Sequence, residues 1–280
     1  MALDGKHFFY VNPLEVHPKT LKFNHIYDHV KPVRQRWFGC ACCPPNIARL
    51  LTSLGHYLYT AREDALFINL YIGNRVELPV GEGTLRLRVS GDFPWHEEVQ
   101  IHIDSPQPVE HTLALRLPDW CDAPRVMLNG SPCEGDTRKG YLWLRRAWQE
   151  GDTLTLTLPM PVRRVYGNPL ARHVAGKVAV QRGPLIYCLE EADNGSELHN
   201  LRLPATAAFR EMPGKGIFAR QVLIQAEGWR QASAEPESQP LWHYDRAPTE
   251  ATPQTLTFIP WFSWANRGEG EMRVWVDERP

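Results

Sequence analysis

The chain has 280 residues, of which 43% are hydrophobic and ten are Trp, and its formal net charge at pH 7 is −1. This length allows large buried cores and favours two domains plus a short additional piece. The balanced charge, with no basic run, argues against nucleic acid or an anionic membrane surface as a partner. No apolar run is long enough to span a bilayer, and the first residues lack the apolar core of a secretory signal peptide.

The first sixty residues contain an irregular, proline-punctuated stretch followed by one clear helix signal. Pro44 and Pro45 have no backbone N–H and a fixed φ, so they suit the first turn of a helix and predict its start. An apolar stripe with helical spacing follows, formed by Ile47, Leu50, Leu51, Leu54 and Leu58. Cys42 and Cys43 would lie at the helix N-terminus, where the helix dipole favours an anion and lowers the pKa of a thiol.

From residue 61 onward the sequence predicts strands. A strand is expected over 66–72, and apolar residues alternate with period two in the segments 85–89, 99–103, 113–117, 126–128, 141–144 and 154–158. Asn129-Gly130 is typical of a tight hairpin turn. These features predict an antiparallel β-sandwich over residues 61–163.

A linker is expected at Pro159-Met160-Pro161 with Arg163-Arg164, before a second β-rich block over 164–280. Strand signals in this block lie at 177–180, 185–189, 256–260 and 272–276. The stretch from about Asp193 to Thr252 is rich in Pro, Gly and charged residues and is expected to contain long loops. The predicted fold class is mainly β, with two antiparallel β-sandwich domains after a helical N-terminal piece.

Several motifs together carry a resemblance to a known family. They are Phe8–Leu14, Arg36–Asn46 with Ala48-Arg49, Leu117–Cys121, Gln181–Tyr187 and Ile259–Gly268. On these residues the chain resembles glycoside hydrolase family 127, the β-L-arabinofuranosidase family. The resemblance implies an (α/α)₆ barrel that carries the active site, followed by two β-sandwich domains. Residues 1–60 would be the last part of that barrel, and 61–163 and 164–280 the middle and C-terminal sandwiches.

The resemblance also implies an unusual chemistry. Cys42 matches a nucleophile held as a thiolate on zinc in a retaining reaction, and Cys43 matches a zinc ligand. The remaining Glu and Cys ligands and the Glu acid/base lie upstream in the family, so this chain contains no acid/base. Cys40 is a third candidate donor, but a tetrahedral site needs four ligands. We therefore expect weak or absent zinc binding and no activity for the chain alone.

For several other residues, a functional role and a purely structural role are both consistent with the sequence. Clustered cysteines are often small buried apolar residues, and Cys121, Cys133 and Cys188 lie in strand patterns as core thiols. Tyr10 and Asn12 are candidates to line the sugar pocket, although Tyr10 beside Phe8 and Phe9 also suits a core. Glu15 as a substitute acid is disfavoured against a solvated surface group. His7, His17, His25 and His29 match no known zinc spacing, and Trp261 and Trp264 suit a core as well as sugar stacking.

Three hypotheses about function follow. The first is a truncated glycosidase of the β-L-arabinofuranosidase type, whose substrate would be an arabinofuranoside-type glycan. The second is a non-catalytic β-sandwich module for carbohydrate binding or subunit contacts, such as a homodimer. The third is one half of a split enzyme that a separate upstream barrel chain completes. Six cysteines, three of them crowded together, do not resemble a disulfide framework, so we expect reduced thiols and a cytoplasmic protein.

Overall fold

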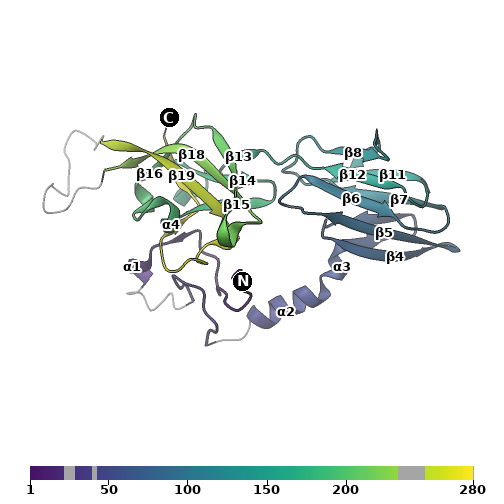
Figure 1. The fold of residues 1–280 in the computed structure, drawn as a ribbon, viewed down its shortest axis with the longest axis horizontal. Coiled ribbons are helices and arrows are strands. Elements are labelled where there is room, and N and C mark those ends of the chain that lie inside the picture. The colour runs from purple at the N-terminus through teal and green to yellow at the C-terminus, as the bar shows by residue number, and fades with distance from the viewer. Residues whose placement is uncertain (22–28, 40–42, 233–249, 280) are drawn as a thin grey trace. The chain divides into compact units, whose positions relative to one another are not determined.

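The computed structural model describes residues 1–21, 29–39, 43–232 and 250–279, and these residues are mainly β, as predicted (Figure 1). They form two compact units. The ring unit contains Met1–Cys40 and Val162–Pro280, and the two-sheet unit contains Ala41–Pro161. In the described part of the chain, no helix has the length and apolarity needed to cross a membrane.

The two-sheet unit begins with two helices and continues in strands. Its elements are α2 (Cys43–Ser53), α3 (Gly55–Leu58), β2 (Tyr59–Ala61), β3 (Ala65–Ile68), β4 (Asn74–Val80), β5 (Gly83–Gly91), β6 (Glu98–Ile103), β7 (Val109–Arg116), β8 (Arg125–Leu128), β9 (Ser131–Pro132), β10 (Asp136–Arg138), β11 (Tyr141–Trp148) and β12 (Thr153–Thr157).

The ring unit combines an N-terminal strand and helix with the C-terminal strands. Its elements are β1 (Glu15–Val16), α1 (Pro18–Leu21), β13 (Val162–Tyr166), η2 (Arg172–Val174), β14 (Lys177–Arg182), β15 (Leu185–Glu190), α4 (Glu191–Asn194), η3 (Leu198–Asn200), β16 (Leu201–Pro204), β17 (Phe209–Pro213), η4 (Gly216–Phe218), β18 (Val222–Gln231), β19 (Ala251–Pro260), η5 (Trp261–Ser263), β20 (Met272–Arg273) and β21 (Val276–Arg279).

In the two-sheet unit, the strand orders are β10-β11-β7-β3-β2 and β4-β5-β6-β12-β8-β9. Alternate residues of both sheets, such as Leu113 and Ile101, join one buried cluster, as the period-two pattern predicts. The pairing of β3 with β7 is parallel, which differs from the purely antiparallel prediction. The reason is the connection: between these two strands the chain builds β4, β5 and β6 in the other sheet, and such a crossover returns the chain in the same direction.

Local predictions in this unit are partly confirmed. Asn129 and Gly130 have φ values of 51° and 81° and join β8 to β9 in a two-residue hairpin, as the Asn-Gly pair predicts. The strand expected over 66–72 is shorter, because β3 ends at Ile68. Strand β4 was not predicted, although its residues Val76, Leu78 and Val80 alternate and pack against the core.

In the ring unit, the pairings close into a circuit of six strands, β14-β15-β19-β18-β16-β21, and β21 pairs with β14 again. The circuit is closed because β14 pairs with β15 through Val180–Arg182 and with β21 through Lys177 and Val178. The core inside it includes Tyr187 and Phe258. The pairing of β16 with β21 is parallel, so this unit is a continuous circuit and not two separate antiparallel sheets.

The C-terminal block contains more strands than the sequence predicts. The stretch from Asp193 to Thr252 was expected to contain long loops, but β16, β17 and β18 lie within it, while 233–249 falls outside the described residues. Charged residues on the exposed faces of β17 and β18 hid an alternation that buries Ile224 and Ala226. The expected linker at 159–164 contains the boundary between the two units, which lies between Pro161 and Val162. Strand β13 begins directly at Val162, and Met160 is buried.

The N-terminal segment packs on the outside of the circuit. Strand β1 pairs with β20, and Val16 joins a second buried cluster with Cys188, Ile259 and Met272, whose side chains face away from the inner core. Helix α2 begins at Cys43 with both prolines in its first turn, as predicted. It ends at Ser53, where the Thr52 and Ser53 hydroxyls donate to the Arg49 carbonyl and Gly55 follows, so the predicted stripe is divided between α2 and α3.

Candidate functional site

The cysteine cluster is placed only at its last member. Cys43 is the first residue of α2 and is half-buried, whereas Cys40 and Cys42 lie outside the described residues. The following two residues, Pro44 and Pro45, remove two of the N–H groups that a helix N-terminus usually offers. The anion-stabilising effect on a neighbouring thiolate therefore depends mainly on the helix dipole and on the N–H groups that remain.

A complete zinc site is not formed by the described residues. Among them, no group of three or more His, Cys, Asp or Glu side chains could hold a metal ion, and Cys43 is the one member of the predicted donor set that they include. The described histidines have other neighbours. His7 Nδ1 lies 2.6 Å from Asp4, His17 Nδ1 lies 2.8 Å from Thr20, and His29 stacks on Tyr10, while His25 is outside the described range. We therefore assign no chemical step to zinc in this chain.

Tyr10 belongs to an aromatic group of the N-terminal segment. Its ring stacks on His29 with centroids 4.5 Å apart and is tilted against Phe38 at 5.3 Å, and Phe8 contacts Phe38 from 5.2 Å. Phe38 is buried and Tyr10 is half-buried, so Tyr10 combines a packed ring with remaining exposure. Tyr10 lies in the ring unit and Cys43 in the two-sheet unit.

Glu15, Cys188 and Cys121 lie in environments that are typical of surface or core residues. Glu15 is exposed on β1, with its carboxylate 3.6 Å from Arg273 Nε, which is the environment of a surface group. Burial raises the pKa of the Cys188 thiol well above its usual value, and the nearby Glu190 and Asp193 carboxylates raise it further, so this thiol is an inert core group. Cys121 is buried in the core between the two sheets.

Of the two tryptophans considered for sugar stacking, Trp264 is buried and Trp261 is half-buried. Trp264 is 3% exposed and stacks on Phe9 at 4.3 Å, and Trp261 Nε1 donates to the Pro13 carbonyl. On the first sheet of the two-sheet unit, Phe67 meets Trp143 edge to face at 5.0 Å, and Arg138 lies 4.0 Å from the Trp143 ring centroid. Phe67 on β3 and Trp143 on β11 meet across the intervening strand β7, where both pair with Ala114, whereas Arg138 and Trp143 lie on neighbouring strands.

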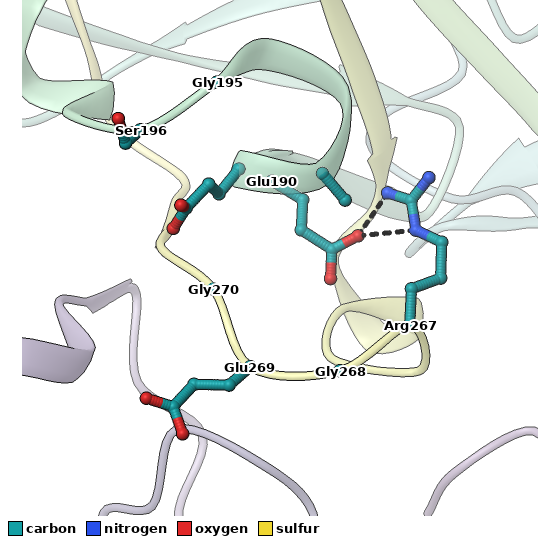
Figure 2. Close-up of a pocket in the computed structure, with 9 residues that line it drawn as sticks. Glu190, Gly195, Ser196, Arg267, Gly268, Glu269 and Gly270 are labelled. Atoms are coloured by element: carbon teal, nitrogen blue, oxygen red, sulfur yellow. Dashed lines mark hydrogen bonds and ion pairs between the residues drawn. The ribbon is translucent and has the colours of Figure 1, made fainter.

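A charged group beside a cavity of about 310 Å³ was missed by the sequence analysis (Figure 2). Glu190, which is 4% exposed, and Arg267 point toward one another, and the Arg267 Nε–H donates to Glu190 Oε2 at 3.1 Å. Arg267 Nη1 donates to Asp193 at 2.7 Å. Hydrogen bonds to Asp193 and then to Glu190 raise the pKa of the Arg267 guanidinium against the opposing effect of burial. One available signal was Glu190 itself, a charge that continues the apolar run of β15.

Comparison with known proteins places these features in one family. Three sequence profiles match: the β-L-arabinofuranosidase GH127 catalytic domain over residues 1–56, the GH127 middle domain over 65–160, and the glycoside hydrolase family 127 C-terminal domain over 162–277. A non-reducing end β-L-arabinofuranosidase from Bifidobacterium longum subsp. longum is 36% identical over 98% of this chain and 42% of its own length.

Solved structures agree with the profiles. A GH127 β-L-arabinofuranosidase from Geobacillus stearothermophilus T6 is 43% identical, with a TM-score of 0.91 over 100% of this chain and 44% of that chain. A further GH127 β-arabinofuranosidase is 31% identical, with a TM-score of 0.84 over 100% of this chain and 43% of that chain. The chain thus spans less than half the length of these relatives. All three domain profiles and both structures carry the same family designation, so the chain belongs to glycoside hydrolase family 127.

Proposed function

We propose that this chain is the C-terminal part of a retaining glycosidase that removes a terminal β-L-arabinofuranosyl unit, and that it acts only when an upstream barrel segment completes it. Residues 1–60 would be the last part of the (α/α)₆ barrel, and 61–163 and 164–280 the two β domains. The relatives are β-L-arabinofuranosidases, which supports the substrate class. Crowded thiols must stay reduced to react, and this requirement supports a reducing compartment such as the cytoplasm.

The observation that carries the proposal is the state of helix α2. Its apolar residues Ile47, Leu50 and Leu51 are 39%, 50% and 59% exposed, and none of its described side chains is buried. An apolar stripe on a helix normally packs against another element, because leaving it in water forfeits the free energy of burial. Relatives more than twice as long supply candidate elements to cover it. The same helix begins at the cysteine cluster, so completing the packing would also complete the site.

The proposed chemistry uses Cys42 as the nucleophile. Its thiolate would attack the anomeric carbon, forming a carbon–sulfur bond while the bond to the departing oxygen breaks. That oxygen would take a proton from a carboxylic acid supplied upstream. Water would then attack the same carbon, give its proton to the same carboxylate, and release the thiolate. Two displacements at one carbon retain its configuration. Cys42 and Cys43, with Cys40 as a third candidate, would serve as metal donors in the completed protein.

The first experiment measures hydrolysis of an aryl β-L-arabinofuranoside. The chain alone should show no turnover, and coexpression or fusion with a barrel segment from a family relative should produce it. In the completed protein Cys42→Ser should abolish turnover, because a serine hydroxyl is neither an anion near neutral pH nor a comparable leaving group. Cys121→Ser is the matched control, since it changes a core thiol and should cost only modest stability. Normal turnover by Cys42→Ser would exclude the thiolate nucleophile.

Zinc content provides a second test. The purified chain should hold clearly less than one zinc per molecule after exhaustive dialysis, and the completed protein should hold one, because half of the donors come from the upstream segment in the proposed arrangement. Elemental analysis measures both. One tightly held zinc on the chain alone would show that its own residues form a full site, and completion by an upstream segment would then be unnecessary for metal binding.

The alternative of a carbohydrate-binding module receives no support from Trp264 and Trp143, whereas Trp37 and Trp229 are 61% and 39% exposed. Sugar stacking requires an open ring face, but Trp264 is buried against Phe9 and Arg138 covers the Trp143 ring. A split enzyme differs from a longer single chain only in whether the upstream segment is covalently attached. The coexpression and fusion arms of the first experiment distinguish these two arrangements.

A further inference from the structure

The loop after β19 contains a residue in an unusual backbone conformation. Ala265 has φ of 55°, in the left-handed region that L side chains adopt only at a cost, and it is buried. No glycine relieves this position. A conformation of this kind persists only where surrounding contacts determine it, and an observed outlier is a reason to ask what it positions.

Buried charges hold this conformation in place. The Ala265 N–H donates to Glu190 Oε1 at 2.7 Å, and the other carboxylate oxygen of Glu190 accepts from Arg267 (Figure 2). Arg267 is tied in turn to Asp193, on α4. The carboxylate that accepts the Ala265 N–H is therefore buried, neutralised by an arginine and fixed relative to β15. The loop Trp261–Arg267, which we call the dock, is thereby anchored to the ring.

The dock receives the N-terminal segment through three kinds of contact. Trp264 stacks on Phe9 with ring centroids 4.3 Å apart and an interplanar angle of 8°. Arg34 Nη2 donates to the carbonyls of Phe262 at 2.7 Å and Trp264 at 2.8 Å, while its guanidinium lies 4.7 Å from the Phe9 ring centroid. At the chain start, the Leu3 N–H donates to Asn266 Oδ1 at 2.9 Å.

Tyr10, the residue after Phe9, lies beside these contacts. Phe8 and Gln35 exchange two backbone hydrogen bonds of 2.9 Å each in an isolated antiparallel bridge, and Phe9 and Arg34 directly adjoin these two residues in the chain. Tyr10 follows Phe9 in the chain, and its ring contacts those of His29 and Phe38. A shift of Phe9 on the Trp264 ring would therefore move Tyr10 as well.

We propose that the dock fixes the position of Tyr10 for sugar binding, with Trp264 and Arg34 as positioning residues and Glu190 holding Trp264 through the Ala265 backbone. This inference rests on the proposed function, because it gives Tyr10 a contact with the sugar in the completed enzyme. The dock lies in the region that the C-terminal domain profile matches, and Tyr10 lies in the region that the catalytic-domain profile matches. The C-terminal β domain would therefore influence substrate affinity through the segment that it holds.

The first test is hydrogen exchange on the full chain. Arg34→Ala should speed exchange of the Phe8 and Gln35 amides by about tenfold and leave the amides of β14 and β19 unchanged. Trp264→Leu should accelerate exchange of the same two amides. If this core variant does not fold, Arg34→Ala alone decides the test. Arg36→Ala is the matched control, because Arg36 is exposed in the same segment and, among the described residues, donates a 3.4 Å hydrogen bond to His7. Unchanged exchange, or equal acceleration in β14 and β19, would overturn the proposal.

The second test uses the completed enzyme. Arg34→Ala should raise KM about tenfold with kcat nearly unchanged, Arg34→Lys should recover part of the loss, and Arg36→Ala should match the wild type. Faster exchange of Phe8 with an unaltered KM would overturn the role in sugar binding. If the completed wild type shows no activity, the proposed function fails, whereas the exchange measurement still decides whether the dock holds the segment.

Discussion

The first forty residues and helix α2 are neighbours in sequence but differ in how they are packed. Val16, Pro18 and Phe38 are buried, and β1 extends a sheet of the ring unit. Helix α2, by contrast, buries none of its described side chains. Both are matched by the same catalytic-domain profile. The first of these two pieces is therefore packed against the rest of the chain, whereas the second leaves its apolar residues exposed.

The largest expected effect comes from charging the exposed face of α2. Leu50→Glu with Leu51→Glu should leave unfolding of the chain alone almost unchanged but prevent completion by the barrel segment. Losing the burial of two leucines costs about 3–6 kcal/mol, a weakening of about a hundredfold or more. The activity recovered at increasing concentrations of the barrel segment measures this weakening of association. Arg49→Glu on another face of the helix is the control. Equal complementation by the double variant would show that this face has no partner.

A matched pair of truncations compares the two regions directly. Val16→Ala removes two buried methyl groups and should lower the free energy of unfolding by about 1.5 kcal/mol. Leu51→Ala removes more atoms, but from an exposed side chain. It should change the free energy of unfolding by less than about 0.5 kcal/mol. Urea unfolding measures both. If Leu51→Ala proved the more destabilising change, α2 would already be packed within the chain and the contrast would disappear.

The smallest expected effect is a pH dependence confined to the two-sheet unit. Burial lowers the pKa of His111 on β7, with a weaker opposing effect from Asp64, and its Nε2 has no hydrogen-bond partner in the part of the chain that the structure describes. The unfolded chain therefore binds this proton more readily than the folded one. Its contribution to stability is complete above about pH 6.5 and declines as the pH falls through that value toward the lower folded pKa.

Urea unfolding at pH 7.5 and 5.5 checks this prediction. Wild type should lose more stability on acidification than His111→Leu, which keeps an apolar group of similar size without the titrating nitrogen. Amide exchange in β7 should respond more than exchange in β19, because β19 and the segment packed beside it belong to the other unit. Parallel pH profiles for the two proteins would remove His111 as the cause.

Local signals in the sequence were sufficient for some elements. Pro44 and Pro45 indicate the start of α2 because each proline restricts its own backbone conformation. Asn129-Gly130 specifies its hairpin by the same kind of local constraint. Strand pairing is different, because it joins residues far apart. Nothing near Val276 indicates that it will pair with β14, or that the following residues will run parallel to β16. The closed circuit was therefore not predictable from periodicity.

The candidate site shows the same limit. Cys42, Cys43 and Tyr10 were identified through the family resemblance, and their residue types alone left a core role open. Glu190 and Arg267 are 77 positions apart, and their pairing depends on β15 and the dock meeting at one place. Phe9 and Trp264 are further apart still. An aromatic pattern predicts that each ring is buried, but not which ring it stacks on.

The closing strand of the circuit has a consequence for synthesis of the chain. Strand β21 is the last of the described strands, and both β16 and β14 use it as a neighbour. Until it emerges from the ribosome, those two strands present unsatisfied backbone groups to other chains, and this exposure is a hazard for aggregation. The two-sheet unit has all its strands by Thr157 and can fold much earlier. A truncation that removes Val276–Arg279 would prolong the vulnerable interval indefinitely, because the ring would never close.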